Sequence, residues 1–293
     1  DEFRAWGWRI PFLLSVLLLG LSVYVRLQIA ESPLFEEIRR RGELSESPVR
    51  ESLLAAANRA RMGAALVVAA AMATSWYTAQ FYSLVFLQTA LQADATTAAA
   101  VIGLAVLAGL ALFVVAGLAS DRWGRRPVML AGMLLTALAV MPAYRALLAL
   151  GNPALAAAQR AAPVVIRIGG GNGATLTGFD AGQLGAALAA AGYPTTSAVP
   201  PLRAPADLRA LHLQLVACLL LMILGAALTC GPGAGWLAEL FPTRIRYTSL
   251  SVPYHLTSAW FGGFMPLTAA WLVARSGDVL AGLFSATTHV ASC

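Results

Sequence analysis

The charged residues of this chain are few, and the densest group of them could form ion pairs. Four charges fall within six residues between positions 121 and 126, and two apolar segments flank them. A charge in membrane hydrocarbon costs about 2.5–3.5 kcal/mol on insertion scales. The chain must therefore leave the apolar phase here, turn tightly and return. Gly124 permits the turn, and Pro127 fits the first turn of the returning helix. An ordinary basic loop between two spans is the alternative.

Two further charged groups follow other apolar segments. Glu31 and Pro33 belong to a Glu-Ser-Pro sequence after the first apolar run. Glu239 begins a Glu-Leu-Phe-Pro-Thr-Arg-Ile-Arg sequence after the fifth. These groups and the 117–127 segment contain the residues that we expect to form turns and ion pairs at the ends of the spans. The turn residues are Gly117, Gly124, Pro127, Glu31 and Pro33, and the charged set is Asp121, Arg122, Arg125, Arg126, Glu239, Arg244 and Arg246.

Four polar or aromatic residues within the apolar segments are the predicted cavity residues. Tyr77 and Gln80 lie one helical turn apart near the middle of the second segment, so they share a face. A glutamine at that depth is costly against lipid, which favours a cavity, although a hydrogen bond between helices is an equal alternative. Tyr254 and His255 belong to a polar stripe in the sixth segment. His255 could titrate near neutral pH, but a packed or hydrogen-bonded histidine is the commoner case.

Composition indicates a helical protein that crosses a membrane several times. The chain has 293 residues, of which 59% are hydrophobic and 12% charged, with a mean hydropathy of +0.72. Several apolar runs reach the ~20 residues that span a bilayer as a helix, the form that pairs all backbone groups internally. The net charge of +6 comes from arginines beside these runs, a pattern that reflects membrane orientation and not nucleic-acid binding.

The sequence offers no catalytic or cofactor motif. Within the apolar segments no His, Asp or Glu set could hold a metal, and no serine or cysteine has a base at fixed spacing. The three cysteines have no metal or redox spacing. A glycine-rich run at 168–175 lacks the preceding strand, the following helix and a basic residue at the right spacing that a nucleotide site needs. We therefore expect no enzyme activity, no metal and no cofactor.

The apolar pattern divides the chain into six parts and predicts about six transmembrane helices. We expect no cleavable signal peptide, because the chain opens with Asp-Glu and not with a basic segment. Twelve arginines fall in the connections at 26–61, 122–126 and 244–246, which places these in the cytoplasm by the positive-inside rule. The predicted parts are a first transmembrane helix (1–34), a cytoplasmic linker with one or two amphipathic helices (35–62), three transmembrane helices (63–150), an extracytoplasmic insert (151–209), two transmembrane helices (210–275) and a tail (276–293).

The charged groups, in this order, resemble a known transporter family. Gly-x-x-x-Asp-Arg-x-Gly-Arg-Arg at 117–126 is similar to the signature loop of the major facilitator superfamily. Glu-Ser-Pro at 31–33 and Ala-Glu-Leu-Phe-Pro-Thr-Arg-x-Arg at 238–246 resemble the sugar-porter and metabolite–proton symporter branches, after helices six and ten. The segments 6–15 and 76–84 resemble helices six and seven of those branches. The resemblance covers nearly the whole chain except 151–209 and the tail.

This resemblance implies an all-α membrane protein with part of a twelve-helix fold, from helix six to helix eleven. It implies a fragment of a secondary transporter in the cell inner membrane. Such a transporter moves an organic acid or zwitterion by proton-coupled alternating access, so the expected partners are a small-molecule substrate, the proton and the lipid bilayer. The charged set would then act as a gate, with a static clamp as the alternative. A non-transporting membrane fragment or a sensor-like protein is the competing function.

Overall fold

The computed structural model describes residues 6–28, 33–153, 156–157, 199–201, 208–276, 280 and 282–283. Within these ranges the regular structure is helical throughout, with no strand. The elements are η1 (Gly7–Arg9), α2 (Ile10–Gln28), α3 (Pro33–Arg40), α4 (Pro48–Leu54), α5 (Ala56–Tyr77), the π-helix η2 (Thr78–Tyr82), α6 (Ser83–Thr89), α7 (Ala95–Trp123), α8 (Arg125–Gly151), α11 (Ala210–Leu240), α12 (Arg246–Thr257), the π-helix η4 (Ser258–Gly263) and α13 (Met265–Ser276). The expected insert at 151–209 and the tail lie mostly outside the described residues, as does Glu31.

Five helical segments of the described chain are long and apolar enough to cross a membrane. A sixth is formed if Phe12–Gln28 and Pro33–Arg40, which meet at 58°, count as one bent span. The prediction of an all-α membrane protein with about six spans is therefore confirmed. The five spans are Ala56–Thr89, Ala95–Trp123, Arg125–Gly151, Ala210–Leu240 and Arg246–Val273.

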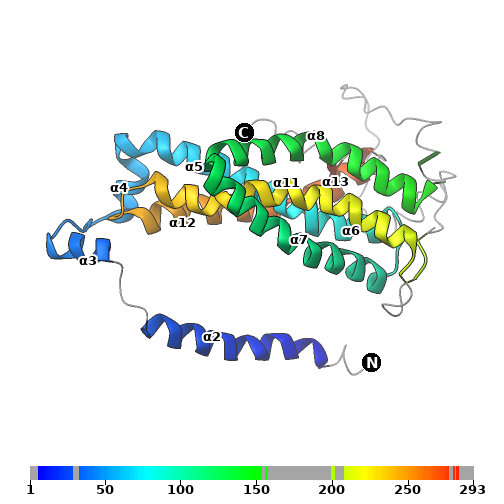
Figure 1. Cartoon of the computed structure of the whole chain (residues 1–293), viewed down its shortest axis with the longest axis horizontal. Coiled ribbons are helices and arrows are strands. Elements are labelled where there is room, and N and C mark those ends of the chain that lie inside the picture. The colour runs from blue at the N-terminus through cyan, green and yellow to red at the C-terminus, as the bar shows by residue number, and fades with distance from the viewer. Residues whose placement is uncertain are drawn as a thin grey trace.

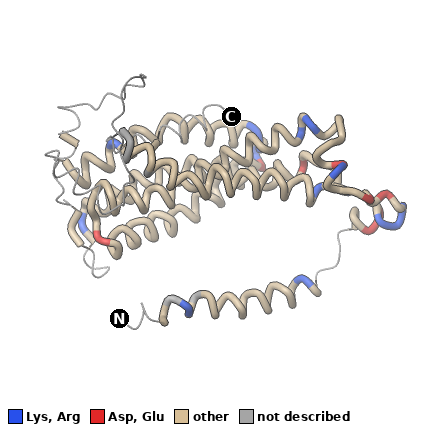
Figure 2. The backbone as a smooth tube through the Cα atoms, turned by 180° about the vertical axis from the view of Figure 1, so that it is seen from behind, with Lys and Arg blue, Asp and Glu red and all other residues tan. Residues whose placement is uncertain are grey.

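The long helices lie side by side in a bundle, whereas α2 lies apart from it (Figure 1). Every α2 side chain that the structure describes is exposed, and most of them are apolar. Charged residues gather near the ends of the helices and in their connections, and the middle of the bundle is almost free of them (Figure 2). This distribution matches a bundle whose middle lies in hydrocarbon, with apolar side chains turned outward toward lipid.

Helices α8 and α11 approach closely through two reciprocal contacts between glycine and threonine. A Cβ atom at Gly132 would lie 2.6 Å from the backbone nitrogen of Thr229, and one at Gly225 would lie 2.5 Å from the Thr136 hydroxyl. Each threonine hydroxyl donates to the carbonyl of the glycine one turn earlier on its own helix, at 2.9 Å. Small residues permit such contact between membrane helices, where van der Waals packing is a main source of association.

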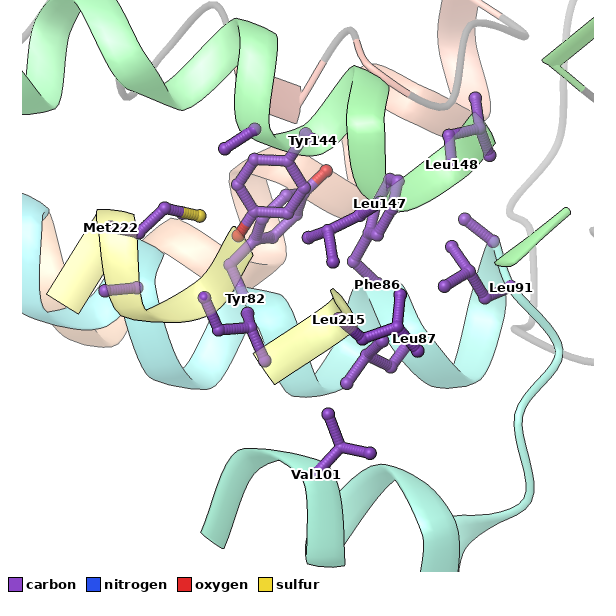
Figure 3. Close-up of a cluster of buried hydrophobic side chains, with 14 of the residues drawn as sticks. Tyr82, Phe86, Leu87, Leu91, Val101, Tyr144, Leu147, Leu148, Leu215 and Met222 are labelled. Carbon is purple, nitrogen blue, oxygen red and sulfur yellow. The ribbon is translucent and has the colours of Figure 1, made fainter. Parts of the chain in front are cut away.

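A buried hydroxyl network ties α8 to the π-helix η2. The Tyr144 hydroxyl donates to the Thr78 carbonyl at 2.8 Å and lies 2.8 Å from the Ser83 hydroxyl, which itself reaches the same carbonyl at 3.1 Å. The Tyr144 ring packs against the rings of Tyr82 and Phe86, with centroids 5.4 and 4.9 Å away (Figure 3). The network therefore satisfies a carbonyl at the irregular part of the span.

We expect Tyr144→Phe to destabilise the bundle by about 0.6–1.7 kcal/mol, because it removes a buried hydrogen bond to Thr78 and leaves packing intact. Thermal unfolding of the purified protein in detergent measures the loss. Tyr247→Phe is the matched control, since Tyr247 is 79% exposed. Equal melting temperatures for the two variants would contradict a stabilising role for the network.

Asp94 caps the N-terminus of α7. Its carboxylate accepts the Thr97 hydroxyl at 2.6 Å and the Thr97 N–H at 3.0 Å. These two hydrogen bonds lower the pKa of Asp94 below its ordinary value, and the bond from the Thr97 hydroxyl has the larger effect. Because the folded-state pKa is lowered, the ionised cap stabilises fully above the ordinary aspartate pKa of about 3.9. That stabilisation is lost as the pH falls through the lowered folded-state pKa.

Asp94→Ala should cost about 0.5–2 kcal/mol at neutral pH, toward the lower end because the cap is exposed to solvent. Asp94→Asn keeps a capping oxygen, so it should retain most of the stability and lose the acid dependence. Unfolding temperatures at pH 7 and in the acid range for wild type and both variants test this. If the unfolding temperatures of wild type and Asp94→Asn fall equally as the pH is lowered, the ionised Asp94 carboxylate does not stabilise α7.

Candidate functional site

The turn between α7 and α8 positions an ion pair with α11. Gly124 is the single non-helical residue between the two helices, and its φ of +90° lies in the region that favours glycine. Arg125 begins α8 directly after it, and its Nη2 lies 3.1 Å from Glu239 Oε1 in the last turn of α11. The guanidinium lies over Gly235, where a Cβ atom would come within 1.7 Å of Nη1. The absence of a side chain at Gly235 is therefore what lets Arg125 reach Glu239.

A second ion pair joins the turn between α11 and α12 to the linker helix α4. Arg244 Nη2 lies 2.5 Å from Glu51 Oε1, so the described partner of Arg244 is Glu51 and not Glu239. Beside it the Ser249 hydroxyl donates to the Ser52 hydroxyl at 2.7 Å, and both serines are fully buried. Sequence reasoning missed Glu51, which it assigned only to the cytoplasmic linker at 35–62 and gave no partner. Only its helical spacing from inward-facing neighbours could have signalled a buried face.

The remaining residues of the predicted charged set have other surroundings. Arg246 donates from Nε to the Phe241 carbonyl at 3.2 Å. The side chains of Asp121, Arg122 and Arg126 are exposed, and within the described ranges they form no ion pair. Arg126 lines a cavity of about 290 Å³ together with Arg125, Trp236, Glu239 and Leu240.

The predicted turn residues differ in their positions. Gly117 lies inside α7, so the turn itself is shorter than the predicted 117–127 segment. Pro127 lies in the first turn of α8, and Pro33 is the first residue of α3. Glu31 lies outside the described residues.

A cavity of about 370 Å³ lies where α5, α11, α12 and η4 meet. Two of the predicted cavity residues, Tyr77 and Tyr254, line it. Gln80 and His255 are not among its lining residues; His255 is exposed and its ring meets the Tyr254 ring edge-on, with centroids 5.5 Å apart. The cavity is also lined by residues outside the predicted cavity set: Met72, Ala73, Trp76, Cys230, Ala234, Leu237, Leu250 and Ser258, the last of which belongs to the polar stripe of the sixth segment.

Close contact between two irregular helix segments fixes Tyr77 in the cavity wall. Tyr77 precedes η2, stacks on Phe81 with centroids 5.0 Å apart, and lies against Gly262 of η4. A Cβ atom at Gly262 would come within 2.4 Å of the tyrosine ring. Ser258, which begins η4, also lines the cavity. π-Helical turns occur frequently at functional sites.

The lining of the cavity can hold a small molecule but supplies no charge. Three aromatic residues, Trp76, Tyr77 and Tyr254, provide ring faces, and Ser258 adds a hydroxyl. Aromatic faces attract cationic groups such as ammonium, while hydroxyls hydrogen-bond to polar atoms. The lining thus combines apolar surface with aromatic rings and hydroxyls. Within the described residues no group of His, Cys, Asp and Glu could hold a metal.

Comparisons with known proteins agree with this architecture. The chain is 26% identical over 98% of its length to the inner membrane metabolite transport protein YhjE of Escherichia coli, covering 52% of that protein. It is 26% identical to the citrate-proton symporter of Klebsiella pneumoniae over 93% of the chain, and to the ectoine/proline transporter ProP of Corynebacterium glutamicum over 95%. These matches cover 47% and 45% of those proteins, so the chain spans about half the length of these relatives.

No solved structure matches the chain significantly. The profile of the Major Facilitator Superfamily matches residues 3–186, a range that includes the charged turn between α7 and α8. Together with the apolar helical bundle, this match shows that the chain is a multi-pass membrane protein belonging to the Major Facilitator Superfamily.

Proposed function

We propose that this chain is part of a secondary active transporter that moves a small organic acid or zwitterion across the cell inner membrane by proton-coupled alternating access. The observation that carries the proposal is the cavity between α5, α11, α12 and η4, in a member of a transporter superfamily. Tyr77 and Ser258 place part of its wall near the middle of two membrane spans. Binding near the membrane midplane is what alternating access requires.

The proposed substrate class follows from the cavity and from the relatives. One relative is named for citrate and protons, and another for ectoine and proline. Citrate, ectoine and proline all contain carboxylates, and ectoine and proline are zwitterions. Because the described cavity lining contains no ionisable Asp, Glu, Arg or His, we propose that a charged partner of the substrate and the proton-binding carboxylate belong to the part of the protein beyond this chain.

The proposed sidedness places the Arg125–Glu239 end of the bundle in the cytoplasm. Support comes from the arginine count, since twelve of the twenty fall in the connections at that end. There the pair would act as a gate that forms in one conformation and separates in the other. The Arg125 and Glu239 side chains are 32% and 64% exposed, so solvent screening limits the pair to about 0–1 kcal/mol. A contribution of that size can bias two states that differ by a few kcal/mol.

Uptake into proteoliposomes that contain the full-length protein tests the transport proposal. Radiolabelled citrate, proline and glycine betaine are the probes, with an inward proton gradient and a protonophore control. We expect uptake of at least one probe that the protonophore abolishes. Trp76→Ala, which opens the cavity wall, should reduce this uptake about tenfold or more, consistent with the loss of a large aromatic contact.

Trp260→Ala is the matched control, because Trp260 is 65% exposed and does not line the cavity. It should leave uptake unchanged. Equal losses in both tryptophan variants would refute the assignment of this cavity as the substrate site. A full-length protein that takes up none of the probes under the gradient would instead favour a non-transporting membrane protein.

The gate is tested by variants that break the ion pair in two different ways. Glu239→Gln removes one charge, whereas Gly235→Ala keeps both charges and displaces the Arg125 guanidinium. We expect each to slow uptake about two- to fivefold at unchanged expression, the range that follows from a pair worth up to ~1 kcal/mol. The double variant Arg125→Glu with Glu239→Arg should recover part of the rate.

Glu37→Gln is the matched control, since Glu37 pairs with Arg41 at 2.8 Å on the exposed helix α3. Its uptake and expression should equal those of wild type. A fall in uptake that parallels a fall in expression for Glu239→Gln would support the static clamp and not the gate.

A further inference from the structure

The helix α4 has an outward face that combines apolar side chains with an arginine. Val49, Leu53 and Leu54 are 56%, 38% and 70% exposed on this seven-residue helix. With Arg50, Ser47 and Pro48 they line a shallow groove of about 420 Å³. Exposed leucine and valine side chains on a water-facing helix would favour association, so this face requires an apolar partner.

The opposite face of α4 is held firmly against the bundle. Glu51 pairs with Arg244, Ser52 accepts from Ser249 at 2.7 Å, and the Asn58 side chain donates to the Glu51 carbonyl at 3.1 Å. These contacts fix the rotation of the helix about its axis. Since Glu51 is the acidic residue of α4 and is turned inward, no carboxylate of this helix neutralises the outward face.

Two more arginines follow within the first two turns of α5. Arg59 and Arg61 are exposed, and like Arg50 they form no ion pair with any residue that the structure describes. Val49, Arg50, Leu53 and Leu54 define the outward face of α4, here called the α4 face, in which the unpaired charge of Arg50 lies beside an apolar groove. Arg59 and Arg61 add two positive charges at the start of α5, on different sides of that helix.

The length of the following span places the α4 face at the membrane surface. The segment Ala56–Thr89 has 34 residues, about 51 Å at 1.5 Å per residue, whereas the hydrocarbon core is about 30 Å thick. Because Arg59 and Arg61 are excluded from hydrocarbon, the excess length at this end lies in the headgroup layer, and α4 precedes it directly. Apolar side chains at this depth meet the upper acyl chains, and arginines meet the phosphates.

We propose that the α4 face binds an anionic phospholipid of the surrounding membrane. Arg50 would contact the headgroup phosphate, where a guanidinium can donate two parallel hydrogen bonds, and Arg59 and Arg61 would add to the positive potential beside it. Val49, Leu53 and Leu54 would pack along the first part of an acyl chain. The uncompensated positive charge selects an anionic headgroup over a zwitterionic one, because the zwitterionic headgroup carries its own cation beside the phosphate.

Native mass spectrometry of the purified protein tests this site. The protein is incubated in detergent with equal amounts of dioleoylphosphatidylglycerol and dioleoylphosphatidylcholine, and the retained lipids are counted. We expect preferential retention of phosphatidylglycerol, and a decrease of about fivefold in its apparent affinity for each arginine removed in Arg50→Gln and Arg59→Gln. The double variant Leu53→Ser with Leu54→Ser should weaken both lipids, and it keeps every charge.

Arg145→Gln is the matched control, because it removes the same charge from an exposed position in the last two turns of α8, on another helix than α4 and α5. It should retain phosphatidylglycerol as wild type does. Equal retention of the two lipids by wild type, or equal retention by Arg50→Gln and Arg145→Gln, would overturn the proposal. Displacement of the lipid by millimolar glycerol 1-phosphate would also overturn it, since the site would then recognise a soluble phosphate.

Discussion

The structure depends on one constraint: in hydrocarbon, backbone polar groups must find partners within the protein. Regular helices meet this constraint by themselves, and the described spans are helical except for a turn at Phe264. Where α5 becomes the π-helix η2, the Thr78 carbonyl receives hydrogen bonds from Tyr144 and Ser83. The hydrogen bond from Tyr144 of α8 thus adds a partner to a carbonyl of the irregular turn, next to the cavity residue Tyr77. The same contact explains why a tyrosine hydroxyl lies in an otherwise apolar cluster.

Small residues permit the close packing that holds membrane helices together. Apolar side chains gain little by exchanging lipid contacts for contacts with another helix, so close backbone approach must contribute instead. Gly132 and Gly225 each accept a threonine of the facing helix, which locks α8 and α11 in one register. That register places Arg125, at the start of α8, opposite Gly235 and Glu239 near the end of α11. The ion pair is therefore a consequence of packing several turns away.

The sequence is sufficient to predict the spans, because charges are excluded from hydrocarbon and apolar runs must be long enough to cross it. The sequence also predicts Arg125 and Glu239 as members of one charged set, because both lie where the chain leaves the membrane. The partner of Arg244 is not predictable in this way. Glu51 stands in a mixed run of charges in which several carboxylates have the same local surroundings, and only the packing of α4 on α12 distinguishes it.

The cavity shows a similar limit. Tyr77 is predictable as a large polar-tipped residue at mid-span, whereas Trp76, Cys230 and Leu250 line the cavity only because three helices converge there. Gln80 follows Tyr77 by one turn, yet its side chain does not reach the lining. Helical spacing fixes which residues share a face, but the face that a neighbouring helix leaves open depends on tertiary contacts such as that between Tyr77 and Gly262.

One helix connects the charged end of the bundle to the cavity. On α11, Gly235 and Glu239 face α8, while Ala234 and Leu237 lie in the cavity wall. Because the two sets lie within two turns of one another, a displacement of the Glu239 end must carry the cavity wall with it. α12 repeats this arrangement: Ser249 is bound to α4, and Leu250 and Tyr254 line the cavity directly after it. Two walls of the cavity are thus held from the same end of the membrane, one by α8 and one by the linker. In the transport cycle proposed above, a motion that separates only one of these attachments would tilt one wall against the other and open the cavity to one side.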